Sequence, residues 1–516
     1  MPTDPALPDG RAASEVLAEL RALRRADAPT RGGRTFAYVY DAGLDGLDAL
    51  AAEAYTAFAT VNGLDPTVFP SVARLENDVV GAAVALLGAP GSQGTFTSGG
   101  TESILLAVKT ARDHARTVRG ITEPELVLPS TAHAAFHKAA AYLGLEPVVV
   151  PVDPATYRAD ADAMAAALTA RTALVVASAP SYAHGVLDPV AEIAAAAAAR
   201  GVLCHVDACI GGWILPYLRR AGREVEPFDL SVPGVTSLSV DLHKYAYADK
   251  GASVVLYRDA ELRRHQYFAH SGWPGYPVVN PTVQGTRSGG LLAQAWAVLR
   301  YIGEEGYTAL AGRVAEASDR LLAGLRSTDG VRVLGDPAAG LVAFTVAGSD
   351  GGTPDLGLVL HLADEMRELG WYLQPQLSFD GLPPNLHLTL TPATTGQVDA
   401  LLDDLGEALA RARALEPVSV DPALAELAAG LDPRTLGPDG VAAVLAFAGL
   451  GEGGGLPART APVLALLDAL PGPLKERLLA EFIGSVFRVR ERPARENPRE
   501  SRPHGGSPSI RLPGEG

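Results

Sequence analysis

The sequence predicts an α/β fold in which helices cover both faces of a mainly parallel sheet. Between residues 70 and 305, short apolar runs typical of buried strands alternate with helical patterns. Polar or glycine-rich segments follow these runs, and ligands in such folds bind at the carboxyl ends of the strands. A smaller α+β pattern follows toward the C-terminus.

The first two segments are an N-terminal arm and a large domain. Residues 1–69 are predicted to form the arm, with an amphipathic helix at 44–58, and we expect the arm to wrap a partner subunit. Residues 70–305 are predicted to form the large domain. Its expected strands are 125–128, 147–152, 173–177, 202–206, 237–240 and 252–257, and its expected helices are 134–143, 161–168 and 189–200.

Three further segments are expected after the large domain. Residues 306–420 are predicted to form a small C-terminal domain, followed by a helical extension at 421–490. Residues 491–516, rich in Pro, Gly, Ser, Arg and Glu, are expected to be a disordered tail. The elements expected in the small domain are a helix at 307–326, strands at 331–334, 341–346 and 386–390, and a closing helix at 396–414.

Composition narrows the possible partners and the compartment. The formal net charge of −16 argues against nucleic acid and against an anionic membrane, since both attract basic surfaces. No apolar run approaches the roughly 18 residues of a membrane span, and the first 28 residues lack a signal-peptide core. The two cysteines, Cys204 and Cys209, are too few for a disulfide framework, so a cytoplasmic location is expected. No metal site is expected.

Lys244 lies in the most informative stretch of the chain. It follows His243 at the end of the apolar run 237–240. A lysine amine placed there can form a Schiff base with the aldehyde of pyridoxal 5'-phosphate, and can carry protons once a substrate amine displaces it. A His-Lys pair alone is common on protein surfaces, so the assignment depends on three upstream segments.

The first of these segments contains Asp207, inside the apolar run 203–209. A buried carboxylate is costly unless a cation or a strong donor pairs with it. Facing a pyridine nitrogen, Asp207 would keep that nitrogen protonated, and the ring could then accept electrons. A solvated strand end or a helix cap is the alternative, but the Gly-Gly-Trp sequence at 211–213 and the lysine beyond favour the cofactor.

The other two segments predict a phosphate cradle and a ring contact. The run Ser98-Gly99-Gly100-Thr101 opens a helical pattern at 104–112, so amide groups, hydroxyls and the positive end of a helix converge there. Its spacing fits neither a P-loop nor a dinucleotide fingerprint, which favours a small phosphorylated cofactor. His133 follows the strand predicted at 125–128 and is placed to stack on an aromatic ring.

Together these motifs resemble the group II decarboxylase branch of fold-type I pyridoxal phosphate enzymes, and within it the sphingosine-1-phosphate lyases. The resemblance runs from about residue 40 to about 487 and is densest between 62 and 307. The strings that carry it are Val68-Phe-Pro70, Thr97-Ser-Gly-Gly-Thr-Glu-Ser-Ile104, Ala132-His-Ala-Ala-Phe136, Ser178-Ala-Pro180, His184-Gly-Val-Leu-Asp-Pro189, His205-Val-Asp-Ala-Cys209, His243-Lys-Tyr245, Gly285-Thr-Arg287 and Gly303-Glu-Glu-Gly-Tyr307.

The resemblance implies a homodimer with active sites at the subunit interface. It also implies a chain of the soluble bacterial type, without the N-terminal membrane anchor of eukaryotic members. The catalytic residues that it implies are Lys244, Asp207 and His133. The implied cofactor contacts add Ser98, Gly99, Gly100, Thr101, Ser178 and His243, with Gly285 and Thr286 reaching the cofactor phosphate across the interface.

The activity implied by the resemblance is a retro-aldol cleavage of a β-hydroxy amine. A base removes the hydroxyl proton, the Cα–Cβ bond breaks, and an aldehyde and an amine such as phosphoethanolamine are released. An amino-acid decarboxylase of the same branch is the alternative, and it needs a cation for the substrate carboxylate that no sequence feature identifies. A cofactor-binding protein without turnover is a third hypothesis, which Asp207 and Lys244 disfavour.

The substrate end of the predicted site departs from the family pattern. The resemblance implies that Lys250 contacts a substrate phosphate, together with Tyr40 and Asn62 from the neighbouring subunit. The family reads Asn-Pro-Leu-His where this chain reads Asn62-Gly-Leu-Asp65, and Asp249 replaces a proline. A carboxylate about 5 Å from a phosphate dianion costs several kcal/mol at an effective dielectric of about 20. Asp65 therefore suits a substrate with a cation, a hydroxyl or no phosphate.

Overall fold

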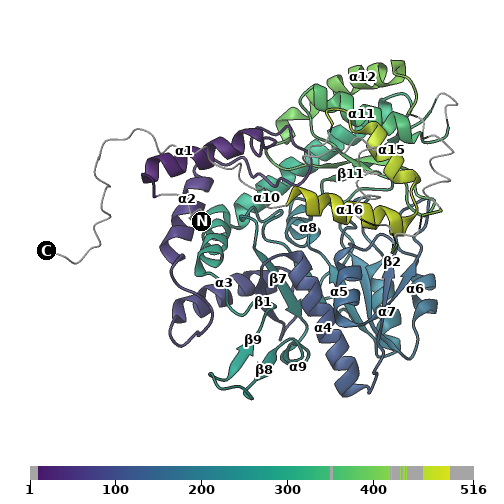
Figure 1. The fold of residues 1–516 in the computed structure, drawn as a ribbon. Coiled ribbons are helices and arrows are strands. Elements are labelled where there is room, and N and C mark those ends of the chain that lie inside the picture. The colour runs from purple at the N-terminus through teal and green to yellow at the C-terminus, as the bar shows by residue number, and fades with distance from the viewer. Residues whose placement is uncertain are drawn as a thin grey trace. The chain divides into compact units, whose positions relative to one another are not determined.

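The computed structural model describes residues 10–348, 352–418, 420, 430–431, 434–435, 437 and 457–487. The chain divides into two compact units, residues 1–419 and 420–516. All of the described strands belong to the first unit (Figure 1). The described helices of the second unit are α15 (Ala461–Ala469) and α16 (Gly472–Val486). The tail predicted at 491–516 and much of the extension predicted at 421–490 lie outside the described residues.

A seven-stranded sheet forms the centre of the first unit, in the order β1-β7-β6-β5-β4-β2-β3. Strand β7 is antiparallel to both of its neighbours, and the other pairings are parallel. The predicted fold class, with its mainly parallel sheet, is therefore confirmed. The strands are β1 (Gln93–Thr97), β2 (Glu125–Pro129), β3 (Glu146–Val150), β4 (Thr172–Ser178), β5 (Leu203–Asp207), β6 (Ser237–Val240) and β7 (Ser253–Tyr257).

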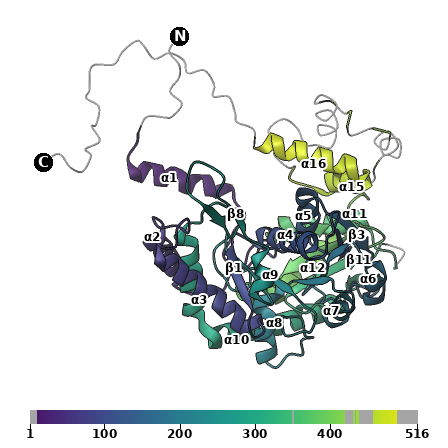
Figure 2. The same ribbon diagram turned by 90° about the horizontal axis from the view of Figure 1, so that it is seen from below.

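Helices cover both faces of this sheet because its central strands are apolar on both sides. In β2, Leu126 and Leu128 pack in one core with helices α4 and α5, whereas Val127 packs in the opposite core. Figure 2 shows the same layers from below. The helices on the first face are α4 (Gly100–Val118) and α5 (Ala135–Leu143), and those on the second include α6 (Ala161–Ala167), α7 (Val190–Ala199) and α8 (Gly211–Arg220).

A smaller antiparallel sheet follows, in the order β10-β11-β13-β12. The N-terminal segment joins this sheet, since the Phe36 N–H donates to the Tyr372 carbonyl at 2.9 Å and Phe36 accepts from the Thr389 N–H. Helices α11 and α12 pack on each other beside it. The elements are β10 (Val331–Val333), β11 (Leu341–Val346), β12 (Gln374–Gln376), β13 (Asn385–Thr389), α11 (Leu356–Glu368) and α12 (Val398–Ala414).

Several helices begin where the sequence did not indicate them. The helix predicted at 307–326 is the second part of α10 (Gly289–Ser327), which bends at Gly303, where φ is 63°. The glycines at its start resemble a loop, but Gly290 is required there because a Cβ would lie 2.9 Å from the Tyr55 ring.

The arm contains α1 (Ala13–Leu23) and α2 (Leu47–Phe58), and α3 (Pro70–Leu87) follows. Among the described residues, no helix is both long and apolar enough to cross a membrane.

One face of the small sheet is polar although it is buried. His387 is fully buried, and neither of its ring nitrogens has a hydrogen-bond partner among the described residues. Its ring lies 4.5 Å from that of Tyr182, between centroids. Burial lowers the pKa of His387 to about 3, and burial likewise lowers the pKa values of His184 and His205 to about 4. All three rings are therefore neutral in the folded protein at neutral pH.

Mild acid is expected to destabilise the fold through these histidines. Histidine in the unfolded chain titrates near 6.5, so between that pH and about 4 the unfolded state binds more protons and the free energy of unfolding falls as pH falls. Each buried histidine contributes about 2 kcal/mol to the loss between pH 7.5 and pH 5. The change His387→Leu should reduce that loss by about 2 kcal/mol in urea unfolding. His137→Leu, at an exposed position, is the control, and equal losses in both variants would contradict the prediction.

Candidate active site

The predicted cofactor residues meet in one cavity of about 310 Å³. They come from the loops that follow β1, β2, β5 and β6, at the carboxyl ends of these strands. Further residues also line the cavity, among them Tyr182, Cys209 and Asp241. The predicted residues that the cavity brings together are Ser98, Gly99, Gly100, Thr101, His133, Asp207, His243 and Lys244.

The turn from β1 into α4 has the form of an anion cradle. Gly99 has φ 152°, and no side chain caps the first turn of the helix, so its amide groups are available to a ligand. A Cβ on Gly100 would lie 2.7 Å from the Cys209 sulfur, so this position requires glycine. The Glu102 carboxylate accepts from the Ser98 N–H at 2.7 Å and from the Val283 N–H at 2.9 Å. Glu102 thus ties the cradle to the loop after β9 (Val278–Asn280).

Lys244 follows β6 and faces a buried carboxylate. Its Nζ lies 3.0 Å from Asp241 Oδ2, and the same oxygen lies 3.5 Å from His243 Nε2. Burial opposes the charge on Lys244, but the surrounding acidic groups, of which Asp241 contributes most, together outweigh burial and raise the pKa of the ammonium group. For Asp241, burial raises the carboxyl pKa, but the neighbouring groups, Lys244 first among them, together outweigh burial and lower it. Burial lowers the pKa of His243 to about 4, so this imidazole is neutral.

Asp207 ends β5 and is held by a buried polar network. Its Oδ1 accepts from the Cys209 N–H at 3.1 Å and from the Ser239 hydroxyl at 3.5 Å. Ser239 Oγ also lies 3.2 Å from His205 Nε2, and His205 Nδ1 lies 2.8 Å from Ser237 Oγ. The network fixes the carboxylate at the cavity wall, where it can hold a proton on a ring nitrogen.

The predicted substrate residues Tyr40 and Lys250 line a second cavity, of about 570 Å³, that shares His243 with the first. Lys250 Nζ lies 5.1 Å from the centre of the Tyr40 ring in the same chain. This differs from the expectation that Tyr40 comes from a neighbouring subunit, because the N-terminal segment pairs with the small sheet of its own chain. Burial raises the pKa of Tyr40 to about 12 and lowers that of Lys250.

Other predicted site residues lie outside the cavity that contains Lys244. Thr286 donates its hydroxyl to Asn62 Oδ1 at 3.2 Å, so these two residues adjoin each other, and Gly285 is exposed beside them. Asp65 is exposed, and hydrogen bonds from the Thr67 hydroxyl and N–H lower its pKa, which keeps the carboxylate ionised. Ser178 is buried at the end of β4, where its N–H donates to Asp188 Oδ2 at 2.7 Å.

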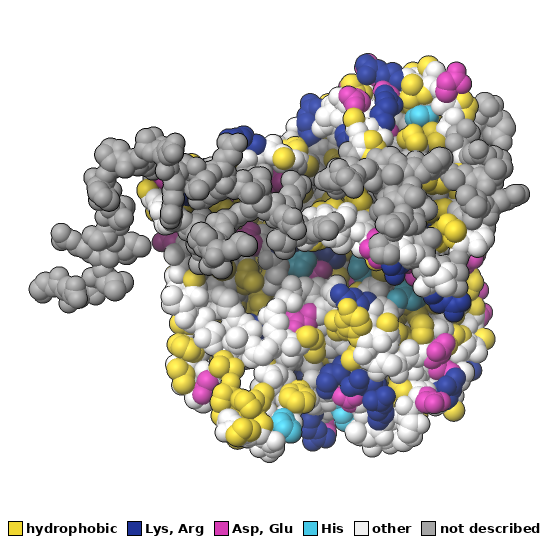
Figure 3. All heavy atoms as spheres, in the orientation of Figure 1, with side chains coloured by type: hydrophobic (Ala, Val, Ile, Leu, Met, Phe, Trp, Pro, Cys, Tyr) yellow, Lys and Arg dark blue, Asp and Glu magenta, His cyan; other side chains and the backbone are white. Residues whose placement is uncertain are grey.

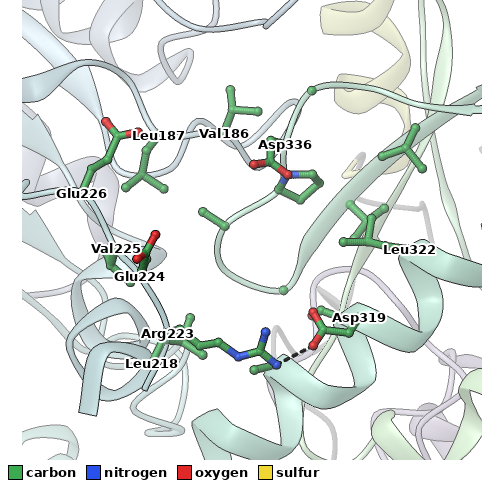
Figure 4. A pocket seen from close by; sticks show the side chains of 18 of the residues that line it. Val186, Leu187, Leu218, Arg223, Glu224, Val225, Glu226, Asp319, Leu322 and Asp336 are labelled. Carbon is green, nitrogen blue, oxygen red and sulfur yellow. Dashed lines mark hydrogen bonds and ion pairs between the residues drawn. The ribbon is translucent and has the colours of Figure 1, made fainter. Parts of the chain in front are cut away.

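Another hollow, of about 640 Å³, is lined by more charged side chains than the cavity around Lys244 (Figure 4). Arg223 points toward Asp319 and pairs with it, and Arg158 pairs with Glu226 in the same hollow. Because both guanidinium groups are already matched by carboxylates, this hollow offers no free cation to an anionic cofactor. The cavity around Lys244 is therefore the better candidate for the active site.

The chemistry of the Lys244 cavity fits pyridoxal 5'-phosphate. The uncapped helix end suits a phosphate, Lys244 supplies an amine for the aldehyde, and Asp207 suits a protonated ring nitrogen. The residues missed by sequence reasoning are Asp241 and Tyr182. Asp241 carried a signal, because it is a charged residue in an apolar run three positions before Lys244. Tyr182 carried none, since its hydroxyl meets Gln374 of β12 only in the fold.

Comparisons with known proteins agree with this site. The family model for the pyridoxal-dependent decarboxylase conserved domain matches residues 27–347, and a model for a C-terminal helix-turn-helix domain of pyridoxal-dependent enzymes matches residues 422–485. Sphingosine-1-phosphate lyase from Arabidopsis thaliana is 40% identical over 78% of this chain and 72% of its own. The Oryza sativa enzyme of that name is 39% identical over 78% and 74%.

Solved structures show the same fold. The sphingosine-1-phosphate lyase of Burkholderia pseudomallei superposes with a TM-score of 0.74 at 38% identity, covering 80% of this chain and 93% of its own. Glutamate decarboxylase from Lactobacillus brevis gives a TM-score of 0.70 at 19% identity, covering 81% and 97%, which supports the fold alone.

Fold, cavity and matches together define a fold-type I enzyme that depends on pyridoxal 5'-phosphate. The chain belongs to the pyridoxal-dependent decarboxylase family. Within that family it is a lyase similar to the sphingosine-1-phosphate lyases, as the sequence motifs predicted.

Proposed function

We propose that this lyase cleaves a β-hydroxy amine by a retro-aldol reaction and releases an aldehyde and an amine. The observation that carries the proposal is the placement of Lys244, Asp207 and an uncapped helix end in one cavity. The identity of 40% to a sphingosine-1-phosphate lyase over most of the chain supports this reaction class. The identity to a probable L-tyrosine/L-aspartate decarboxylase is lower, at 34%, which gives the alternative less support.

Bound pyridoxal 5'-phosphate supplies an aldehyde for the amine and a ring that takes up the electrons of the broken bond. In the proposed mechanism, Lys244 carries a proton on Nζ and returns it to carbon after cleavage. Asp207 would hold a proton on the ring nitrogen, and His133 would pack against the ring face. Ser98 and Thr101 would hold the phosphate together with the first-turn amides of α4. These contacts would orient the substrate and so determine which of its bonds breaks.

The polar end of the substrate is proposed to lie near Lys250 and Tyr40, beyond His243. The ammonium of Lys250 over the Tyr40 ring supports an anionic or strongly polar group at this place. The ionised Asp65, contributed by a second subunit with Asn62, would oppose a phosphate dianion there. We therefore expect β-hydroxy amines without a phosphate group, or with additional hydroxyl groups, to compete well with phosphate esters.

A homodimer is proposed to complete the site. Asn62, Gly285 and Thr286 lie on the surface of their own chain, where they can reach the cavity of a second copy. Figure 3 shows apolar side chains gathered over the hairpin of β8 (Phe268–His270) and β9. An exposed apolar patch of this kind is typical of an interface. Its members near these three residues are Val68, Phe268, Trp273, Tyr276, Val279 and Val283.

A cytoplasmic location is also proposed. Cys204 and Cys209 are free and buried, and burial raises the pKa of the Cys204 thiol to about 12. Burial raises the pKa of the Cys209 thiol as well, so both thiols remain protonated and unreactive at neutral pH. Two inert thiols without a disulfide suit a reducing compartment.

A substrate screen with two readouts tests the proposed reaction. The full chain, loaded with pyridoxal 5'-phosphate, is offered β-hydroxy amines with and without phosphate, and also amino acids. Aldehyde and carbon dioxide are measured together in each reaction. We expect aldehyde without carbon dioxide, whereas carbon dioxide without aldehyde would establish the decarboxylase. A chain that binds the cofactor on Lys244 but releases neither product would be the non-catalytic binding protein.

A further inference from the structure

Asp241 is a buried carboxylate in the cavity that the proposed mechanism does not use. Its side chain is 2% exposed, and Oδ2 lies 3.0 Å from Lys244 Nζ. The neutral imidazole of His243 lies 3.5 Å from the same oxygen. A buried carboxylate this close to one cation stabilises the charged form of that cation.

The backbone fixes this pair rather than leaving it to two flexible side chains. The Asp241 N–H donates to the Cys209 carbonyl at 3.1 Å, and the Lys244 N–H donates to the Asp241 carbonyl at 3.3 Å, so the pair spans one tight turn after β6. A Cβ on Gly100 would lie 2.9 Å from Asp241 Oδ2. The carboxylate therefore packs directly on the first turn of α4.

We propose that Asp241 is a positioning residue that holds Lys244 as an ammonium ion whenever the amine is not bonded to the cofactor. The proposal rests on the function proposed for Lys244. During turnover the substrate amine displaces Lys244, and Asp241 then receives the freed side chain on its own side of the cavity. The proton stays on Nζ, so the lysine cannot attack the cofactor again before the substrate has reacted.

Other charged or titratable groups face Lys244 and contribute to its titration. The cations oppose its charge and the anions favour it, whereas Asp241 itself forms the ion pair with Nζ, at 3.0 Å. They come from every element around the lysine: Tyr40 of the N-terminal segment, His133, Tyr182, Asp207 and Cys209 after the neighbouring strands, and His243 and Lys250 of its own loop.

The capture of the cofactor by the amine provides a test. The ammonium group first loses a proton to solvent. The neutral amine then attacks the aldehyde carbon, a C–N bond forms, and the aldehyde oxygen leaves as water. Borohydride then adds hydride and fixes the bond for peptide mapping. The rate of capture by the full chain freed of cofactor therefore follows the fraction of neutral Lys244.

The Asp241→Asn variant should capture pyridoxal 5'-phosphate faster than the wild type at pH 7, by about tenfold for each unit by which the lysine pKa falls. The pH midpoint of the rate should move down, and the two rates should converge at high pH. Asp241→Glu, which keeps the charge, should stay near the wild type. Asp113→Asn is the matched control, because Asp113 pairs with Lys109 at 2.8 Å on α4, away from the cavity.

Equal midpoints in Asp241→Asn and the wild type would overturn the proposal, since a structural role alone changes the rate but not its pH midpoint. If Asp241→Asn does not fold, the pKa of Lys244 can be measured in the native wild type instead, from the rate at which acetic anhydride labels this lysine at varied pH. Lys244 must then titrate above the ordinary lysine value of about 10.4, and a midpoint at or below that value would overturn the proposal. Cofactor fixed on another lysine in the wild type would instead refute the proposed function.

Discussion

The change Lys244→Ala is expected to abolish aldehyde release, with a loss of at least about 10⁴-fold in kcat, because one amine both anchors the cofactor and carries the proton. The variant also leaves Asp241 buried without its cation. Removing one partner of a buried ion pair typically costs about 3–5 kcal/mol, so we expect a lower free energy of unfolding as well. Aldehyde release, urea unfolding and borohydride mapping of the fixed cofactor are the measurements.

Two companion variants separate these effects. Lys244→Arg keeps a cation beside Asp241, so it should recover much of the lost stability while aldehyde release stays absent. Lys138→Ala removes an exposed lysine that lies over the Tyr142 ring and should change neither quantity. Aldehyde release by Lys244→Ala at more than a few per cent of the wild-type rate would mean that another residue holds the cofactor.

The change Asp207→Asn is expected to lower kcat by about 10³-fold, which is near the loss seen when one well-placed electrostatic contact is removed from a transition state. The amide keeps the shape of the side chain but cannot hold a proton on the ring nitrogen. The chain should still bind pyridoxal 5'-phosphate on Lys244, with a higher dissociation constant. Kinetics and a cofactor titration followed by absorbance measure the two effects.

Two further variants serve as controls for this prediction, one in the hydrogen-bond network of Asp207 and one away from it. Ser239→Ala removes the hydroxyl that lies 3.5 Å from Asp207 and should weaken activity by a smaller factor than Asp207→Asn. Asp229→Asn changes a carboxylate that is equally buried but accepts from the Ser231 N–H, away from the cavity. A loss of activity in Asp229→Asn as large as in Asp207→Asn would show that the effect is one of folding rather than of ring protonation.

The strands and the motif residues at their ends could be expected from sequence because both depend on local patterns. The strand 237–240 alternates serine with Leu238 and Val240 and is buried along its whole length, and Lys244 follows it within four residues. For α10 the same reasoning predicted only the second part, 307–326, whereas the helix begins at Gly289. Gly290 is there because α2 approaches closely, and α2 lies more than two hundred residues earlier in the chain.

The parts of the site that escaped prediction depend on contacts between distant segments. The Tyr182 hydroxyl acquires its partner Gln374 only when the small sheet packs on the loop after β4. Tyr40 itself was expected to come from a neighbouring subunit, yet Lys250 of the same chain lies near its ring. Spacing along the chain contains no information on either pairing, because the residues that meet are separated by most of a domain.

The carboxylate of Glu102 has a consequence for how tightly the cofactor is retained. It accepts a hydrogen bond from one amide of the cradle and from one amide of the loop that continues to Gly285. The conformation of the cradle is therefore coupled to the conformation of this loop. Thermodynamic linkage then works in both directions by the same factor. A contact that immobilises this loop should therefore raise the affinity of the cradle for the cofactor phosphate. Binding of the phosphate should in turn immobilise the loop.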